Sequence, residues 1–215
     1  MDVTSAPVSG LASRFIVVSG NIGAGKSTLV KSLAEALGSV GVLERHTKNP
    51  YLQSFYESPA RWAFHAQAGF LRLSIEDYER VCAAGGAVLE RTLEEHHDVF
   101  ARELHDSGML SDQEFEILER LQRSVSLPRP DLLIYLHAPP RTLAERIALR
   151  DRAGESNVSL EYLTGLGRRY EEFAARWDAS PLVPVDTVEL DFRRDDGLTE
   201  VIDRCISAVA GKERQ

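Results

Sequence analysis

Short apolar runs alternate with longer amphipathic segments along this chain. The apolar runs are rich in Val, Ile and Leu and lack polar alternation, and they lie at 14–19, 40–44, 86–92, 131–138 and 182–186. Such runs are typical of buried parallel strands. The segments with helical character lie at 26–37, 58–84, 94–107, 111–126, 140–152, 160–177 and 197–210. This alternation predicts an α/β fold with a parallel sheet of about five strands and helices on both faces.

A glycine-rich loop follows the first apolar run. Its spacing, Gly20-x4-Gly25-Lys26-Ser27, is the Walker A pattern between a strand and a helix. We expect the whole loop to contact a nucleoside triphosphate, and its residues are Gly20, Asn21, Ile22, Gly23, Ala24, Gly25, Lys26, Ser27 and Thr28. Backbone N–H groups and the helix N-terminus attract phosphate oxygens. Lys26, in a solvated loop, is predicted to hold the β- and γ-phosphates, and Ser27 to bind Mg²⁺. The loop therefore predicts a P-loop NTPase-type sheet with ATP and Mg²⁺ as ligands.

Three charged residues fall at the ends of other predicted strands. Glu44 ends the second apolar run, and Glu90 and Arg91 lie at the end of the third. Ligands of parallel sheets bind beyond the carboxyl ends of the strands, where the P-loop also lies. A carboxylate there can accept a proton from a hydroxyl or serve a metal ion, and an arginine can neutralise phosphoryl charge. These residues predict phosphoryl transfer to an acceptor that carries a hydroxyl group.

Composition limits the remaining possibilities. The 215 residues suit one domain, 1–215, with a flexible N-terminus at 1–13, and the net charge of -8 argues against nucleic acid as the main partner. Cys82 and Cys205 match no metal or redox spacing. His96 and His97 are adjacent on a predicted helix and point apart, so we expect no metal pair there. With no signal peptide and no apolar run of membrane length, we expect a cytoplasmic protein without a membrane partner.

Four segments carry a resemblance to a known family. "GNIGAGKST", "LERHTKNPYLQSFYESPARWAFHAQ", "LERTLEEHHDVFARELHDSGML" and "ERIALRDRAGE" occur in this order. Together they resemble the deoxynucleoside kinases, in particular bacterial deoxyadenosine and deoxyguanosine kinases, over residues 15–192. The resemblance implies transfer of the γ-phosphate of ATP to the 5′-hydroxyl of a deoxynucleoside in nucleotide salvage. It also implies a preference for purines and a homodimer, with a heterodimer of paralogues left open.

The same resemblance implies roles for individual residues. Glu44 matches the general base, Glu90 the Mg²⁺ ligand, and Arg91 the arginine that serves the phosphates. The substrate would be held by Tyr56 and Glu155 at the 3′-hydroxyl, by Gln67 at the nucleobase and by Phe100 packed against that base. The lid, about 146–158, would bring Arg146, Arg150 and Arg152 to the phosphates. The segment "VELDF" at 188–192 resembles the loop that touches the base of the donor.

The chain departs from the family pattern where the base is read. His96 stands where the family commonly has an aspartate, and it remains a candidate for substrate binding. Ser74 replaces an arginine, although Arg72 lies nearby, and Ala66 replaces the aromatic residue before the base-reading glutamine. The catalytic residues are therefore intact, whereas the residues that read the base are altered.

Two other functions stay open at this point. A nucleoside-monophosphate kinase shares the same loop, but it needs basic residues for the phosphate of its acceptor. A non-catalytic nucleotide-binding subunit could instead regulate a paired kinase. Turnover by the purified protein alone separates these readings, because a regulatory subunit binds ATP without consuming it.

Overall fold

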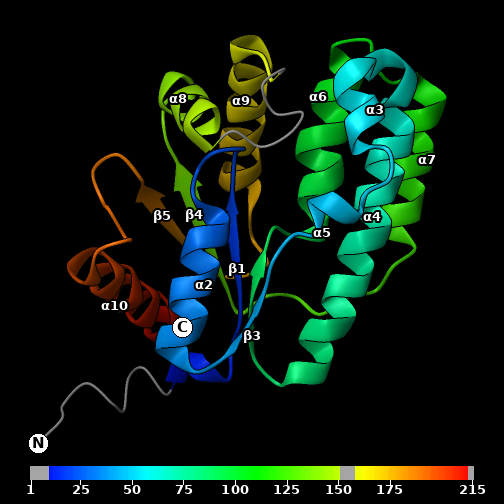
Figure 1. The fold of residues 1–215 in the computed structure, drawn as a ribbon. Helices are drawn as coiled ribbons and strands as arrows, with labels where there is room; N and C mark the ends of the chain where they lie inside the picture. The colour runs from blue at the N-terminus through cyan, green and yellow to red at the C-terminus, as the bar shows by residue number, and fades with distance from the viewer. Residues whose placement is uncertain (1–9, 151–157, 213–215) are drawn as a thin grey trace, which may run out of the picture.

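A five-stranded parallel sheet forms the centre of the computed structural model, which describes residues 10–150 and 158–212 (Figure 1). The strands are β1 (Phe15–Gly20), β2 (Val40–Val42), β3 (Ala87–Glu90), β4 (Leu132–His137) and β5 (Leu182–Asp186). Their order is β2-β3-β1-β4-β5, and every neighbouring pair is parallel. The predicted strands are confirmed, but β2 ends at Val42, so Glu44 lies two residues beyond the strand rather than at its end.

Helices surround this sheet. They are α2 (Lys26–Leu37), α3 (Leu52–Glu57), α4 (Pro59–Ala84), α5 (Leu93–Glu95), α6 (Arg102–Asp106), α7 (Asp112–Arg123), α8 (Pro140–Arg150), α9 (Leu160–Arg176) and α10 (Asp195–Lys212), with a 3₁₀ turn η1 (His46–Lys48) and a π-helix η2 (His96–Ala101). The helix predicted at 94–107 is wrong in detail, because the π-helix interrupts it. Helix α3 was not predicted from the sequence, because its six residues are too few to show a clear helical period.

The alternation of side chains along β1 separates two hydrophobic layers. Ile16 and Val18 pack with residues of α2, α8 and α10, whereas Phe15 and Val17 pack with residues of α4 and α9. Figure 1 shows α2 and α10 on one side of the sheet and α4 on the other. Both faces are thus covered, which explains why the strands are apolar on both sides.

A third hydrophobic cluster lies outside the sheet. It joins Phe55 of α3, Ala63 and Ala66 of α4, Leu104 of α6 and Leu118 of α7. These helices stand beside the carboxyl ends of β1 and β3 (Figure 1). They therefore provide a wall opposite the P-loop.

Candidate active site

The P-loop holds its lysine by its own backbone. Gly20, Gly23 and Gly25 have φ values of 142°, 83° and 101°, which side chains rarely allow. In this loop the Lys26 ammonium donates a hydrogen bond to the Asn21 carbonyl at 2.9 Å. Lys26 is only 5% exposed, so the expectation of a solvated lysine is wrong, because the loop closes around its side chain. Burial, followed by the positive charge of Arg91, lowers the pKa of Lys26 from 10.5 to about 8.

A chain of two hydrogen bonds through the Glu90 carboxylate joins the P-loop to β3 and to the loop after β2. The Ser27 hydroxyl donates to Glu90 Oε1 at 3.0 Å, and the backbone N–H of Glu44 donates to Glu90 Oε2 at 3.3 Å. A hydroxyl and a carboxylate are hard oxygen ligands, which Mg²⁺ prefers together with phosphate oxygens and water. Among the described residues no cluster of three or more His, Cys, Asp or Glu could hold a metal on its own. Ser27 and Glu90 therefore fit a magnesium ion that arrives with the triphosphate.

The residue pair Glu44 and Arg91 lies beside this chain. Arg91 Nε donates to Glu44 Oε1 at 2.9 Å. Burial alone would raise the pKa of the Glu44 carboxyl, but the adjacent Arg91 guanidinium lowers it to about 2. Arg91 has a φ of 75°, which is strained for a residue with a side chain.

Buried partners hold Arg91 in this strained position. Arg91 Nη1 donates to Glu95 Oε2 at 3.2 Å and also contacts the Tyr170 hydroxyl, which itself donates to Glu95 Oε2 at 2.8 Å. Thr92 and Glu95 form a capping box at the start of α5. The sequence reasoning missed Glu95 and Tyr170. The T-x-x-E spacing could have indicated Glu95, but Tyr170 comes from α9, and no local pattern links it to Arg91.

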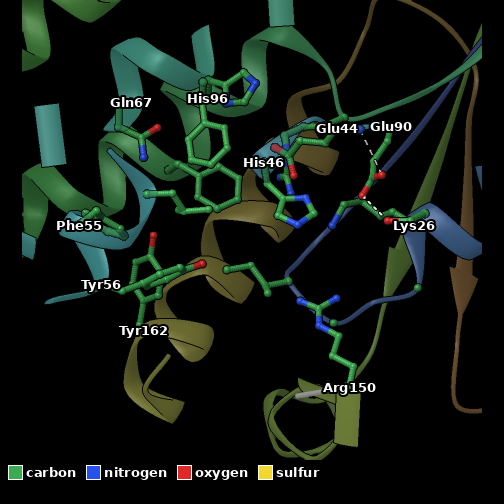
Figure 2. A pocket seen from close by; sticks show the side chains of 18 of the residues that line it. Lys26, Glu44, His46, Phe55, Tyr56, Gln67, Glu90, His96, Arg150 and Tyr162 are labelled. Atoms are coloured by element: carbon green, nitrogen blue, oxygen red, sulfur yellow. Dashed lines mark hydrogen bonds and ion pairs between the residues drawn. The ribbon is translucent and has the colours of Figure 1, made fainter. Parts of the chain in front are cut away.

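A cavity of about 320 Å³ runs from the P-loop to α4 (Figure 2). It brings together these residues expected from the sequence: Ile22, Gly23, Gly25, Lys26, Ser27, Thr28, Glu44, Tyr56, Gln67, Glu90, Arg91, His96, Phe100 and Arg150. Gln67 lies on the opposite side from Lys26 and Glu90 (Figure 2), whereas His96 shares a small cavity with Glu44 and Glu90. The cavity thus has a P-loop end, which suits phosphates, and a second end at Gln67 of α4.

A buried polar side chain, that of Gln67, lies at the α4 end of the cavity. Gln67 is 4% exposed, and its Oε1 atom has no hydrogen-bond partner among the described residues. An amide oxygen buried without a partner is costly, unless a ligand completes it. The helix of Gln67 therefore does not satisfy its side chain.

Aromatic rings surround that glutamine end. The His96 imidazole stacks on Phe70, with ring centroids 6.0 Å apart and planes 12° apart, and burial lowers its pKa to about 4, so it is neutral at pH 7. Phe100 also lines the cavity, with the Arg91 guanidinium 4.5 Å from its ring centroid. The π-helix η2 carries both His96 and Phe100, whereas Asp98 of the same helix bonds to His97 at 2.8 Å.

Three findings concern the departures from the family pattern. Ser74 is buried and lines a small cavity with Glu44, Asp77 and His96. Arg72 forms a surface ion pair with Glu76, so it does not take the place of the missing arginine. Ala66 is fully buried and packs in the cluster between α3, α4, α6 and α7.

The predicted lid is only partly within the described residues. Arg150 lines the main cavity, but Arg146 donates to Thr187 Oγ1 at 2.7 Å and to the Thr187 carbonyl at 2.8 Å. Arg146 lines a neighbouring pocket beside the P-loop, and Phe192 lies there too. Arg152 and Glu155 lie outside the described residues. Arg146 and Arg150 therefore share the second pocket, where Thr187 holds Arg146, and of the two Arg150 also lines the main cavity.

Comparisons with known proteins give a consistent result. The family model described as deoxynucleoside kinase matches residues 16–209. The deoxyadenosine/deoxycytidine kinase of Bacillus subtilis is 32% identical over 93% of this chain and 95% of its own length. The deoxyadenosine kinase of Dictyostelium discoideum is 38% identical over 81% of this chain and 71% of its own. A structure of the deoxyadenosine kinase from M. mycoides, with products dCMP and a flexible dCDP bound, has a TM-score of 0.79 and 26% identity, and covers 89% of this chain and 98% of its own.

The chain belongs to the deoxynucleoside kinase family. It is therefore an ATP-dependent phosphotransferase that acts on deoxynucleosides. No helix in the part of the chain that the structure describes is long and apolar enough to cross a bilayer.

Further residues of this deoxynucleoside kinase line the cavity without having been expected from the sequence. They are His46, Leu52, Phe55, Phe70 and Tyr162. Phe70 lies three residues after Gln67 on α4, a spacing that places two side chains on one helix face. That spacing could have indicated Phe70, whereas Phe55 and Leu52 belong to the short helix that the sequence did not reveal.

Proposed function

We propose that this kinase transfers the γ-phosphate of Mg·ATP to the 5′-hydroxyl of a purine deoxynucleoside. The single observation that carries the orientation is the buried Gln67 Oε1 atom, which has no partner among the described residues and lies at the end of the cavity away from Lys26. A glutamine amide can bond bidentately to an adenine edge. With the base at Gln67, the sugar spans the cavity and its 5′-hydroxyl reaches Glu44.

The cations at the P-loop end hold the donor. Lys26 binds the β- and γ-phosphates, and Arg91 neutralises the charge that spreads over the transferred phosphoryl group. Ser27 and Glu90 would hold Mg²⁺, which would reduce the repulsion between the phosphate oxygens and the attacking alcohol. The P-loop end thus supplies positioning and charge compensation, which are the main effects in this type of reaction.

Glu44 accepts the proton of the 5′-hydroxyl of the acceptor. Its low pKa keeps the carboxylate ionised at pH 7, so it accepts a hydrogen bond from the 5′-hydroxyl and orients it. A carboxylate of such low basicity does not deprotonate a free alcohol. The alcohol becomes much more acidic as its oxygen bonds to phosphorus, and the proton then passes to Glu44.

The arrangement of charge disfavours a nucleoside monophosphate as the acceptor. With the base at Gln67, the 5′-phosphate of a monophosphate would lie at the P-loop end, where the Glu44 and Glu90 carboxylates line the cavity. The lowered pKa of Glu44 keeps its carboxylate charged, and this charge repels a phosphate. An uncharged 5′-hydroxyl fits this position better.

Other parts of the proposal rest on the family resemblance and on fewer contacts. Tyr56, with Glu155, would hold the 3′-hydroxyl, the lid would bring Arg150 and Arg152 to the phosphates, and the loop at Phe192 would receive the base of the donor. A role in nucleotide salvage in the cytoplasm and a homodimer complete the proposal. In support of a dimer, α7 exposes Ile117 and Leu121, each 46% exposed.

A phosphorylation screen tests this function. The purified chain is incubated with Mg·ATP and each of the four deoxynucleosides, their ribose forms and deoxyadenosine monophosphate, and products are separated by chromatography. We expect 5′-monophosphates from purine deoxynucleosides and a preference for deoxyribose of at least about tenfold in kcat/KM, which corresponds to about 1.4 kcal/mol. Binding of ATP without any product would indicate a regulatory subunit, and use of the monophosphate alone would indicate a nucleoside-monophosphate kinase.

A further inference from the structure

The loop that carries Glu44 leaves the sheet at its least supported strand. β2 is an edge strand of three residues, and within the described residues it pairs only with β3. Glu44 follows two residues later, where the ladder has ended. Apart from its own bonds to Glu90 and Arg91, the position of its carboxylate therefore depends on what fixes the loop beyond β2.

Arg45, the next residue, bonds to α4 at three points. Its Nε donates to Asp77 Oδ1 at 2.7 Å, and its Nη2 donates to the Leu73 carbonyl at 3.0 Å and to Glu76 Oε2 at 2.9 Å. Asp77 is 4% exposed, so this ion pair is shielded from water on one side. Charge-assisted bonds of a guanidinium fork are strong and directional. Arg45 thus fixes the backbone that adjoins Glu44.

Asn49 fixes the other end of the same loop. Its Nδ2 donates to the Ala66 carbonyl of α4 at 2.9 Å, and its Oδ1 accepts from the backbone N–H of Tyr51 at 3.1 Å. Gly69 makes room for this contact, because a Cβ added there would lie 2.6 Å from Asn49 Oδ1. Gln67 and Phe70 lie on α4 between the two attachment points.

We propose that Arg45 is a positioning residue, which ties the loop of Glu44 to helix α4 and so fixes the catalytic carboxylate relative to the base-reading Gln67. This inference rests on the roles of Glu44 and Gln67 proposed above. The nucleoside spans the gap between these two residues, so its 5′-oxygen meets Glu44 correctly only if α4 and the loop keep one relative position. Displacement of a reacting group by about 1 Å can cost about 10²-fold in rate.

The chain offers a matched control for Arg45. Arg80 also pairs with Asp77, at 3.4 Å, but its side chain is 53% exposed and it forms no hydrogen bond or ion pair with the described loop residues 43–51. Arg45→Met and Arg80→Met therefore each remove one cation from the same carboxylate, and only the first removes the attachment of the loop. Steady-state kinetics with the deoxynucleoside that the wild type uses best compare the two variants.

We expect Arg45→Met to lower kcat at least about tenfold while KM for the nucleoside changes less than about threefold, because the base still binds but Glu44 is displaced. Arg80→Met should match the wild type. Arg45→Lys, which can bond to one acceptor, should recover part of the loss in kcat. Equal kinetics of Arg45→Met and Arg80→Met, or a loss confined to KM, would overturn the proposal.

A double variant separates loop position from stability. Arg45→Met leaves the buried Asp77 with one distant partner, so its melting temperature should fall. Arg45→Met/Asp77→Asn removes that buried charge, and we expect a recovered melting temperature with kcat as low as in Arg45→Met. A recovered kcat would show that the unpaired charge, and not the loose loop, caused the loss. A wild type that phosphorylates no deoxynucleoside would instead remove the proposed function and this inference together.

Discussion

The two ends of the main cavity differ in how their polar groups are satisfied. At the P-loop end Lys26, Ser27, Glu90 and Arg91 all have partners within the protein. At the α4 end the Gln67 oxygen is buried and has no partner among the described residues. The first end is held in place before any ligand arrives, whereas the second leaves hydrogen-bonding capacity for the ligand.

This difference separates rate from selectivity. Groups that are already oriented stabilise the transition state without reorganisation, and the strained backbone of Arg91 is part of that orientation. An unpaired amide instead gains its bonds only from a base of matching shape. Substitutions at the P-loop end should therefore lower the rate for every substrate, and substitutions at the α4 end should change which substrate is preferred.

The largest effect is expected for Lys26→Ala. Transfer should fall below detection, beyond the about 10³-fold that loss of one charge-stabilising donor can cost. The melting temperature should not fall much, because the substitution also removes a buried ammonium whose pKa is depressed by burial. Lys26→Met, which keeps most of the side-chain volume, is the control and should be equally inactive. Near-normal transfer by either variant would exclude the P-loop from the mechanism.

Glu44→Gln is expected to lower kcat by about 10²–10⁴, which is typical for loss of a general base, with KM little changed. The amide keeps the size of the carboxylate and can still bond to the 5′-hydroxyl, but it cannot take up a proton at neutral pH. Steady-state kinetics distinguish this from a role in ground-state binding, in which KM would rise while kcat stayed the same.

A smaller effect is expected at the other end, for Gln67→Leu. Loss of a bidentate base contact should lower kcat/KM by about 10- to 100-fold. The melting temperature of the free protein should stay the same or rise, because the variant removes a buried oxygen without a partner. Gln122→Leu is the matched control, since Gln122 Oε1 is also buried without a partner in the described part of the chain, but Gln122 does not line the cavity. Equal kinetics of the two leucine variants would remove Gln67 from base recognition.

The weakest effect concerns pH. The pKa of Lys26 is lowered to about 8 in the free protein, so the ammonium is lost as pH rises through 8. Binding of a triphosphate favours the charged form and must then take up a proton, so affinity for ATP should be constant below pH 8 and about tenfold weaker at pH 9. Because the pKa of Lys26 is lower in the folded protein, the buried charge destabilises the fold fully below pH 8. This destabilisation decreases as the pH rises from 8 toward 10.5. Titration calorimetry at pH 7 and 9 measures the effect, and Lys26→Met should abolish it.

The sequence predicted the P-loop end well, for physical reasons. The Walker A spacing is local, and parallel strands bring Glu44, Glu90 and Arg91 to one edge wherever the chain places them. The burial of Lys26 was not predicted, because it depends on how the loop closes. Nor was the contact of Arg91 with Tyr170, because these residues are 79 positions apart.

The structure of the α4 end of the cavity was harder to predict from the sequence. The π-helix that carries His96 and Phe100 has no distinct periodicity over so few residues, and α3 is too short for one. Ser74 and His96 were recognised as departures from the family pattern. Only the structure shows that these two line one small cavity together with Glu44, whereas Ala66, the third altered residue, packs elsewhere.

One measurement tests the central claim that rate and selectivity lie at opposite ends of the cavity. It is the ratio of kcat/KM for deoxyadenosine to that for deoxycytidine, determined for the wild type, Glu44→Gln and Gln67→Leu. We predict that Glu44→Gln keeps the ratio of the wild type while lowering both values, and that Gln67→Leu changes the ratio. A changed ratio in Glu44→Gln, or an unchanged ratio with both values lowered in Gln67→Leu, would contradict the account.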